Sequence, residues 1–275
     1  LVPFGQFGDG LDPDLLVGLS PSDDAAVYRL TDDLALVTTT DFFPPVVDDP
    51  ADYGAIAAAN ACSDVFAMGG RVVLALNVAA FPEALPRDVV ATVLDAARSV
   101  VVAAGGMVGG GHTIRSDEPI FGLAVSGLVH PAQVFRKGAA RAGQVLVLSK
   151  PLGTGLVLAG GDDRQRSAAT AGMRALNREA AETLGAVRDR VGAVTDVTGF
   201  GLAGHGAEVA ERSGVTLVID TGALPVYDGA IDVAAAGTRT GGDARNRAAV
   251  EGRGRGPAGG ARAPAAGGVG PPDPG

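Results

Sequence analysis

The sequence predicts an α/β protein with mixed α+β layers and two domains. Apolar, β-branched runs typical of strands alternate with stretches of helical period, and this texture recurs on both sides of a basic stretch at residues 136–141. The chain has 275 residues, of which 47% are hydrophobic and 19% charged, a balance that suits two ordinary domains. We expect an N-terminal domain at 22–135 and a C-terminal domain at 141–246, flanked by a segment at 1–21 and a tail at 247–275.

One helix organises the first domain. Asp49 is a favourable N-cap, Pro50 suits the first helical position, and the pair Gly69-Gly70 permits a left-handed C-cap. Asn60 and Asp64 stand four residues apart and therefore project from one face of this helix. The other elements expected in this half are strands at 23–28, 34–40, 72–81 and 120–129 and a helix at 89–104.

The second half repeats the alternation of strands and helices. We expect strands at 145–149 and 215–219, a helix at 167–190, and a further helix that starts at the glycines after Asp196. The cations at 136–141 are interpreted as solvated charges of a linker. From Arg247 onward the composition changes to Gly, Arg, Ala and Pro, which cannot bury a core, so we expect a disordered tail or a frame-shifted reading.

Composition excludes several classes of protein. A net charge of -9, no Trp and few aromatic residues argue against nucleic-acid binding. No apolar run approaches the ~20 residues of a membrane span, and the start has no basic region of a secretory signal, so we expect a cytoplasmic protein. The single cysteine, Cys62, excludes an intramolecular disulfide, and its alanine-rich surroundings predict a small buried side chain rather than a nucleophile.

Carboxylates recur where the expected elements end. Asp24, Asp41, Asp64 and Asp196 offer the hard oxygen ligands that Mg²⁺ prefers. The glycine-rich stretch at 109–113 offers backbone N–H groups that suit phosphate oxygens, although such stretches are also ordinary loops. Because the P-loop and protein-kinase signatures are both missing, these features predict a metal-dependent phosphoryl-transfer enzyme of neither common class.

A dinucleotide site is a minor alternative. Gly199, Gly201 and Gly204 fit G-x-G-x-x-G, and Asp220 ends the next expected strand, as in an NAD-binding dehydrogenase-like unit. Against this alternative, Asp196 interrupts the apolar run that should lead into the first glycine, and its carboxylate would repel a pyrophosphate in the absence of a cation.

Several separate motifs follow one another along the chain. They are Asp12-Pro13-Asp14-Leu15-Leu16-Val17-Gly18, Asp23-Asp24-Ala25-Ala26-Val27-Tyr28, Thr39-Thr40-Asp41-Phe42-Phe43, Ser63-Asp64-Val65-Phe66-Ala67-Met68-Gly69-Gly70, Glu118-Pro119-Ile120-Phe121-Gly122 and Thr195-Asp196-Val197-Thr198-Gly199-Phe200-Gly201. These motifs closely resemble those of selenophosphate synthetases (selenide, water dikinases), with matching order and spacing from about Asp12 to Arg245. The wider superfamily, which includes aminoimidazole ribonucleotide synthetase and thiamine-monophosphate kinase, would share the acids but not these flanking residues.

The resemblance implies a two-domain aminoimidazole ribonucleotide synthetase-like fold that dimerises through strands of the N-terminal domain. It also implies a reaction in which ATP, selenide and water give selenophosphate, AMP and phosphate, with Mg²⁺ as cofactor. By position, the implied metal ligands are Asp24, Asp64 and Asp196. The implied ATP contacts are Asp23, Asp41, Asp64, Gly111, His112 and Thr113.

The chain departs from the family at both ends. The family's glycine-rich segment with a catalytic cysteine or selenocysteine and a nearby lysine would lie upstream of Leu1, and Cys62 does not replace it, so we assign no catalytic residue within this chain. After Arg247 the resemblance is lost. We therefore expect the chain as printed to bind Mg-ATP without making selenophosphate. The alternatives are an inactive Mg-ATP-binding fragment and another ATP-using superfamily member, similar to thiamine-monophosphate kinase.

Overall fold

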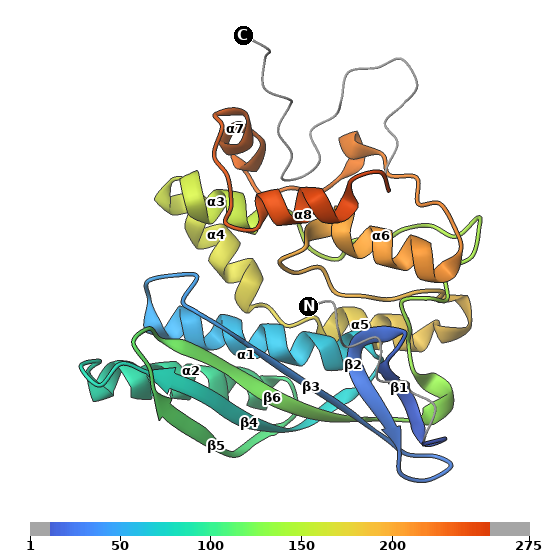
Figure 1. Ribbon diagram of the computed structural model, residues 1–275, viewed down its shortest axis with the longest axis horizontal. Helices are drawn as coiled ribbons and strands as arrows, with labels where there is room; N and C mark the ends of the chain where they lie inside the picture. Colours follow the sequence, from blue (N-terminus) through green and yellow to red (C-terminus); the bar gives the residue numbers. More distant parts are fainter. Residues whose placement is uncertain (1–11, 254–275) are drawn as a thin grey trace. The chain divides into compact units, whose positions relative to one another are not determined.

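The computed structural model describes residues 12–253, which divide into two compact units (Figure 1). Within the described residues, unit 1 comprises 12–136 and 173–196, and unit 2 comprises 137–172 and 197–253. The segment 173–196 is expected in the C-terminal domain, but it lies in unit 1. This matters for the site because the segment ends at Asp196.

Unit 1 contains a six-stranded sheet of order β1-β2-β3-β6-β4-β5. All neighbouring strands are antiparallel except β4 and β5, which are parallel. The strands are β1 (Leu15–Leu19), β2 (Ser22–Arg29), β3 (Ala35–Phe43), β4 (Arg71–Phe81), β5 (Met107–Arg115) and β6 (Ile120–Val129). The expected strands at 23–28, 72–81 and 120–129 are thus confirmed as β2, β4 and β6.

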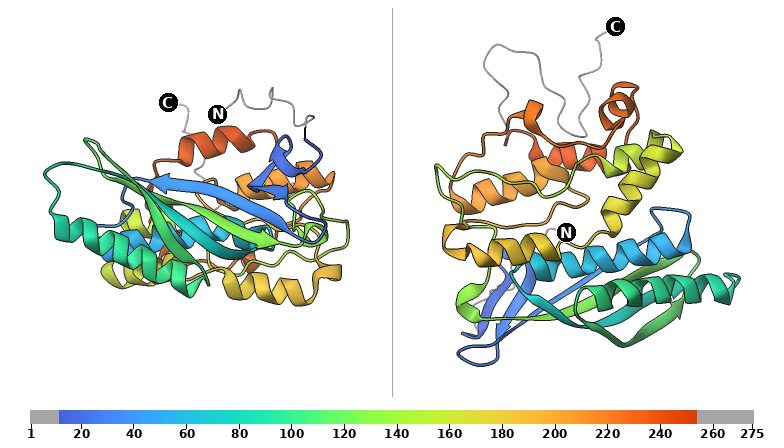
Figure 2. Two further views of the ribbon diagram at one scale, coloured as in Figure 1. Left: turned by 90° about the horizontal axis from the view of Figure 1, so that it is seen from below. Right: turned by 180° about the vertical axis from the view of Figure 1, so that it is seen from behind.

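Two helices, α1 (Pro50–Ala67) and α2 (Arg87–Ala103), cover one face of this sheet (Figure 2). The caps expected for α1 are confirmed: the Asp49 side chain accepts a hydrogen bond from the backbone N of Asp52 at 2.8 Å, and Gly69 has φ +74°. The two helices cross closely, since a Cβ on Gly54 would lie 2.1 Å from the carbonyl oxygen of Val93.

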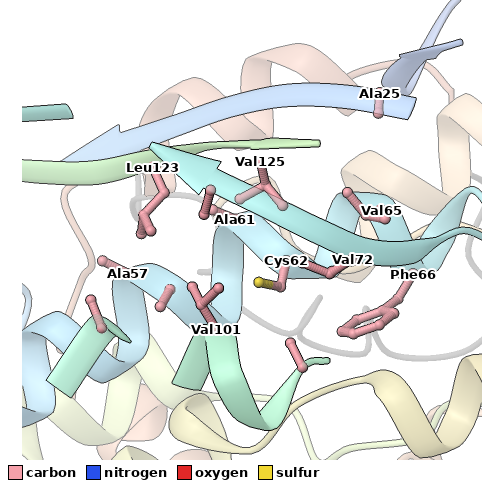
Figure 3. Close-up of a cluster of buried hydrophobic side chains, with 14 of the residues drawn as sticks. Ala25, Ala57, Ala61, Cys62, Val65, Phe66, Val72, Val101, Leu123 and Val125 are labelled. Atoms are coloured by element: carbon pink, nitrogen blue, oxygen red, sulfur yellow. The ribbon is translucent and has the colours of Figure 1, made fainter. Parts of the chain in front are cut away.

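The core of unit 1 lies between these helices and the inner face of the sheet. Small α1 side chains such as Ala57 and Ala61 let the helix approach Leu123 and Val125 of β6 (Figure 3). Cys62 lies in this core, as expected, and burial raises the pKa of its thiol to about 12. The thiol is therefore a packing group rather than a nucleophile.

Two strands differ from expectation, both for reasons of pairing. β3 does not end before Asp41 but continues to Phe43, because it pairs with β6 in the register Asp41↔Leu123 and Phe43↔Phe121. The glycine-rich stretch at 109–113 is not a loop but part of edge strand β5. Gly111 pairs with Asn77, and a Cβ there would lie 2.3 Å from the Asn77 carbonyl oxygen, so the glycine is needed for close pairing.

The expected helix at 167–190 is divided. It forms α4 (Asp163–Arg174), α5 (Arg178–Ala186) and the 3-10 turn η3 (Arg188–Arg190). Two hydrogen bonds form at the break between α4 and α5. Asn177 Nδ2 donates to Ser63 Oγ of α1 at 2.7 Å, and Arg178 Nη1 donates to the Ala103 carbonyl at 3.1 Å. These bonds attach the returning chain to unit 1.

Unit 2 is mainly helical in the described residues. Besides most of α4, its helices are α3 (Thr154–Gly160), α6 (Gly201–Ser213), α7 (Ala230–Ala235) and α8 (Asp243–Val250). The strands expected at 145–149 and 215–219 are wrong: neither segment pairs as a strand within residues 12–253, and Val145 and Val147 are 86% and 84% exposed. Their β-branched pattern predicts a strand, but a strand also needs a paired neighbour.

Two further expectations change in unit 2. Lys137 is not a solvated linker charge but is buried, with its Nζ 3.3 Å from Glu208 Oε2. Helix α6 starts at Gly201, among the glycines that follow Asp196, as expected. The flanking strands that a dinucleotide-binding unit requires are absent from the described part of the chain, which removes support for that alternative.

The tail expected from Arg247 onward begins within a helix. Helix α8 continues across Arg247 to Val250, supported by contact of Arg247 Nε with Asp243 Oδ2 at 3.3 Å. Residues 254–275 of the expected tail lie outside the described residues, as do residues 1–11 of the segment at 1–21. None of the helices described between residues 12 and 253 combines the length and apolar character that crossing a membrane requires. The cytoplasmic location stays a prediction.

Candidate metal and nucleotide site

Three carboxylates from distant parts of the sequence converge in unit 1. Asp24 lies in β2, Asp64 in the last turn of α1, and Asp196 at the end of the returning segment. One ligand oxygen from each of the three lies within 4.8 Å of the others. This spacing allows a single cation to bind all three.

Asp64 is the most buried of the group. Its Oδ2 accepts a hydrogen bond from Thr39 Oγ1 at 2.6 Å. Burial, together with the nearby charges of Asp196, Asp41 and Asp24, raises the pKa of Asp64 to about 8. The fold therefore holds a carboxylate among other carboxylates, at a cost that a bound cation would offset.

Asp41 extends the acidic group. It lies two residues after Thr39 on the inner face of β3, and Asn60 Nδ2 of α1 donates to its Oδ2 at 2.6 Å. Burial and the charge of Asp196 raise the pKa of Asp41. The expectation that Asn60 and Asp64 share one helix face is confirmed, because both bond inner-face residues of the same strand.

The third carboxylate, Asp196, is positioned by the residues that precede it in the chain. Ala193 forms a parallel bridge with Arg136, and Val194 N donates to the Arg136 carbonyl at 3.1 Å. Thr195 Oγ1 donates to Asp24 Oδ1 at 3.2 Å. The segment before Asp196 is thus attached to β2 and to the chain that follows β6.

The donor set fits a hard divalent cation. Within residues 12–253, Asp41, Asp64 and Asp196 form no ion pair with Lys, Arg or His, and the buried Oδ2 of Asp196 has no hydrogen-bond partner there. Because every donor is a carboxylate oxygen and none is a sulfur or imidazole, the group suits Mg²⁺ better than Zn²⁺ or copper.

The structure does not bring every expected residue into this group. Asp23 adjoins Asp24 in β2, but Gly111, His112 and Thr113 lie exposed on edge strand β5. The register Asp41↔Leu123↔Asn77↔Gly111 places Gly111 three strand spacings from Asp41, which is roughly 14 Å. The hydroxyls of Thr39 and Thr195 were not singled out from the sequence, although the period of two from Asp41 could have indicated Thr39.

Comparison with known proteins defines the class. The chain matches the family model of the AIR synthase related protein N-terminal domain over residues 22–129 and that of the C-terminal domain over 141–242. Solved structures with this fold include AaThiL complexed with AMPPCP and TMP (TM-score 0.67, 21% identity, 78% of this chain and 72% of that one). Another is hydrogenase maturation protein HypE in complex with ATP (TM-score 0.59, 23% identity, 82% and 68%). The fold is that of an AIR synthase-related protein.

Curated relatives define the family more narrowly. The chain is 52% identical over 245 residues to the selenide, water dikinase of Burkholderia pseudomallei, covering 87% of this chain and 69% of that protein. It is 47% identical over 244 residues to that of Caldanaerobacter subterraneus subsp. tengcongensis, covering 87% and 70%. This chain belongs to the selenide, water dikinase family.

Proposed function

We propose that this chain carries the Mg-ATP site of an enzyme that makes selenophosphate, AMP and phosphate from ATP, selenide and water. The observation that carries the proposal is the convergence of Asp24, Asp64 and Asp196 in a chain 52% identical to a curated selenide, water dikinase. Likeness to thiamine-monophosphate kinases at 20–22% identity reflects the shared fold and favours no second substrate.

The three aspartates would hold Mg²⁺ in unit 1. When bound, Mg²⁺ would neutralise part of the phosphate charge and orient the transferring group. The chain itself supplies rigid positioning: Asp24 is fixed in a paired strand, and Asp64 and Asp41 each accept a hydrogen bond of 2.6 Å, from Thr39 and Asn60. Such fixed geometry is what phosphoryl transfer requires of a protein.

Asp23 and Asp41 are proposed as nucleotide contacts. A carboxylate repels phosphate directly, so these two would act through the cation or by accepting hydrogen bonds from hydroxyl or amino groups of the nucleotide. Gly111, His112 and Thr113 are proposed as further ATP contacts, because the exposed edge of β5 offers backbone N–H groups.

A homodimer is also proposed, with the second copy across the outer face of the sheet in unit 1. Side chains on this face alternate with the inner-face residues that contact α1. Its exposed apolar residues include Phe42, Leu74, Leu76, Met107 and Ile114. An uncovered apolar face of this kind is typical of a protein interface.

The dimer is tested with a charge on this face. Leu76→Lys should convert a dimer to a monomer in light scattering, because a lysine would be desolvated in an apolar interface. Val102→Lys is the matched control, since Val102 is exposed on α2, on the helix-covered side. A monomeric wild-type protein, or a dimer unaffected by Leu76→Lys, would contradict the proposed interface.

The activity is tested by selenide-dependent release of AMP from ATP in the presence of Mg²⁺. The assay compares the chain as printed with a version preceded by the N-terminal segment of the Burkholderia pseudomallei relative. We expect AMP from the extended version, and Mg-ATP binding without AMP from the printed chain. AMP from both would overturn the expectation that the cysteine or selenocysteine and the lysine of the family's N-terminal segment are needed. AMP from neither would overturn the proposed activity.

A further inference from the structure

Thr39 is the one side chain that donates a hydrogen bond to the Asp64 carboxylate within residues 12–253. Its Oγ1 lies 2.6 Å from Asp64 Oδ2, a normal length for a hydroxyl that donates to a carboxylate. Thr39 belongs to the motif Thr39-Thr40-Asp41-Phe42-Phe43, in which only Asp41 has an expected role. A carboxylate that accepts a hydrogen bond from a fixed hydroxyl on one of its oxygens can bind a cation differently from a carboxylate that accepts none.

Both ends of this hydrogen bond are held in place. Thr39 lies in β3, which pairs with β2 on one side and with β6 on the other, in the register Thr39↔Val125. Asp64 follows Ser63, which accepts from Asn177, and its helix is packed into the core. A threonine is also restricted at χ1, so its hydroxyl cannot swing freely away from the carboxylate.

The bond limits how Asp64 can bind a cation. With one lone pair of Oδ2 accepting from Thr39, Oδ1 is the oxygen whose lone pairs are both open to an ion, so the bond would favour Asp64 as a one-oxygen ligand. Mg²⁺ requires near-octahedral geometry, whereas Ca²⁺ accepts more ligands and readily takes both oxygens of one carboxylate. A hydroxyl that keeps Asp64 from chelating therefore favours the smaller ion.

We propose that Thr39 is a positioning residue that sets the preference of this site for Mg²⁺ over Ca²⁺. The inference rests on the proposed cation site at Asp24, Asp64 and Asp196. Thr195 makes a similar but longer bond to Asp24, at 3.2 Å, so Thr39 is the tighter of the two restraints.

The test measures cation affinity rather than turnover. Mg²⁺ and Ca²⁺ are titrated separately into the full chain by calorimetry, without nucleotide. Thr39→Val removes the hydroxyl and keeps the shape, and Thr39→Ser restores the hydroxyl. Thr38→Val is the matched control, because Thr38 is the adjacent residue of β3, on the opposite face, with its hydroxyl 3.5 Å from Ser126 Oγ.

We expect Thr39→Val to weaken Mg²⁺ binding by about 10-fold or more, the usual effect of losing a residue that orients a metal ligand. Ca²⁺ binding should change by much less, so the ratio of the two affinities falls. Thr39→Ser and Thr38→Val should keep the wild-type ratio. If the valine variant does not fold, as judged by circular dichroism, Thr39→Ala removes the same hydroxyl and the titrations are repeated on it.

If Thr39→Val weakens the binding of Mg²⁺ and Ca²⁺ equally, or changes neither, the ratio of the two affinities stays the same. That result would show a merely structural role and overturn the inference. A wild-type chain that binds neither ion would overturn the cation site together with the inference. A changed ratio, together with no AMP from either version in the activity assay, would leave this inference standing while the proposed activity fails.

Discussion

The Asp64→Asn variant is expected to lose Mg-ATP binding in calorimetry, with affinity at least about 100-fold below that of the wild type. Mutation of a residue that only orients a metal ligand typically lowers metal affinity by about 10–100-fold, and Asp64 is proposed as a ligand itself. Removing it also leaves Asp41 and Asp196 facing the triphosphate with a weakened counter-ion. Asp95→Asn on α2 is the control, since Asp95 is exposed and pairs with Arg98 at the surface.

The same variant should respond differently to pH. Because the pKa of Asp64 is raised to about 8, the folded metal-free protein keeps its proton where the unfolded chain has lost it. The stability of the metal-free wild type therefore falls as pH rises from about 4 to 8, and Mg²⁺ competes better for the site over the same range. Asparagine has no ionisable proton, so in the variant both the stability of the metal-free protein and its affinity for Mg²⁺ should depend less on pH.

Unchanged Mg-ATP affinity in Asp64→Asn would sink the assignment of Asp64. NAD is titrated into the wild type as a second check. We expect no binding, because the helix that follows Gly199 is not flanked by strands in the described structure. Clear NAD binding would revive the dinucleotide alternative.

The organising helix of unit 1 was predictable because its signals are local. Asp49, Pro50 and Gly69 act on their own neighbours, and the spacing of Asn60 and Asp64 fixes a shared face wherever the helix lies. The resemblance of the flanking motifs to a family allowed the aspartates to be proposed in advance as a metal group, and this assignment stays a prediction. Their meeting within 4.8 Å depends on the order of strands and the return of the chain at 173–196, which no local pattern encodes.

The errors fall where pairing or burial partners decide the outcome. Val145 and Val147 have strand-like side chains but no paired strand in the described residues. Gly111 reads as a loop residue, yet its lack of a side chain serves close pairing with Asn77. Lys137 reads as a solvated linker charge because the sequence does not show that Glu208 of α6, which also contacts His205, lies against it.

That buried group gives the other large effect expected here. Lys137 Nζ lies 3.3 Å from Glu208 Oε2 with its side chain only 8% exposed, and His205 Nδ1 lies 3.8 Å from the same oxygen. His205 Nε2 accepts from the backbone N of Thr198 at 3.2 Å, so in the neutral imidazole the hydrogen is on Nδ1 and faces Glu208. The imidazole and the lysine charge together lower the pKa of Glu208 to about 2, against the opposing effect of burial.

Glu208→Gln should therefore destabilise unit 2 at neutral pH, because it leaves the buried Lys137 ammonium without its carboxylate. Breaking a fully buried pair costs about 3–5 kcal/mol. Since the Glu208 side chain is 35% exposed, solvent screens the pair, and we expect about 2 kcal/mol. Hydrogen exchange of the α6 amides reports this loss for unit 2 alone.

The pH dependence separates this charge effect from a packing defect. The pKa of Glu208 is lower in the folded than in the unfolded protein, so its carboxylate adds stability at pH values above the pKa of the unfolded chain. This stability is lost as pH falls from about 5 towards 2. The difference between wild type and Glu208→Gln should thus be largest near about pH 7 and shrink through that window. Glu211→Gln on the same helix removes only an exposed pair with Arg253 and should cost no more than about 0.5 kcal/mol at any pH. A Glu208→Gln deficit that stays constant down to about pH 3 would show that the lost stability comes from packing and not from the carboxylate charge.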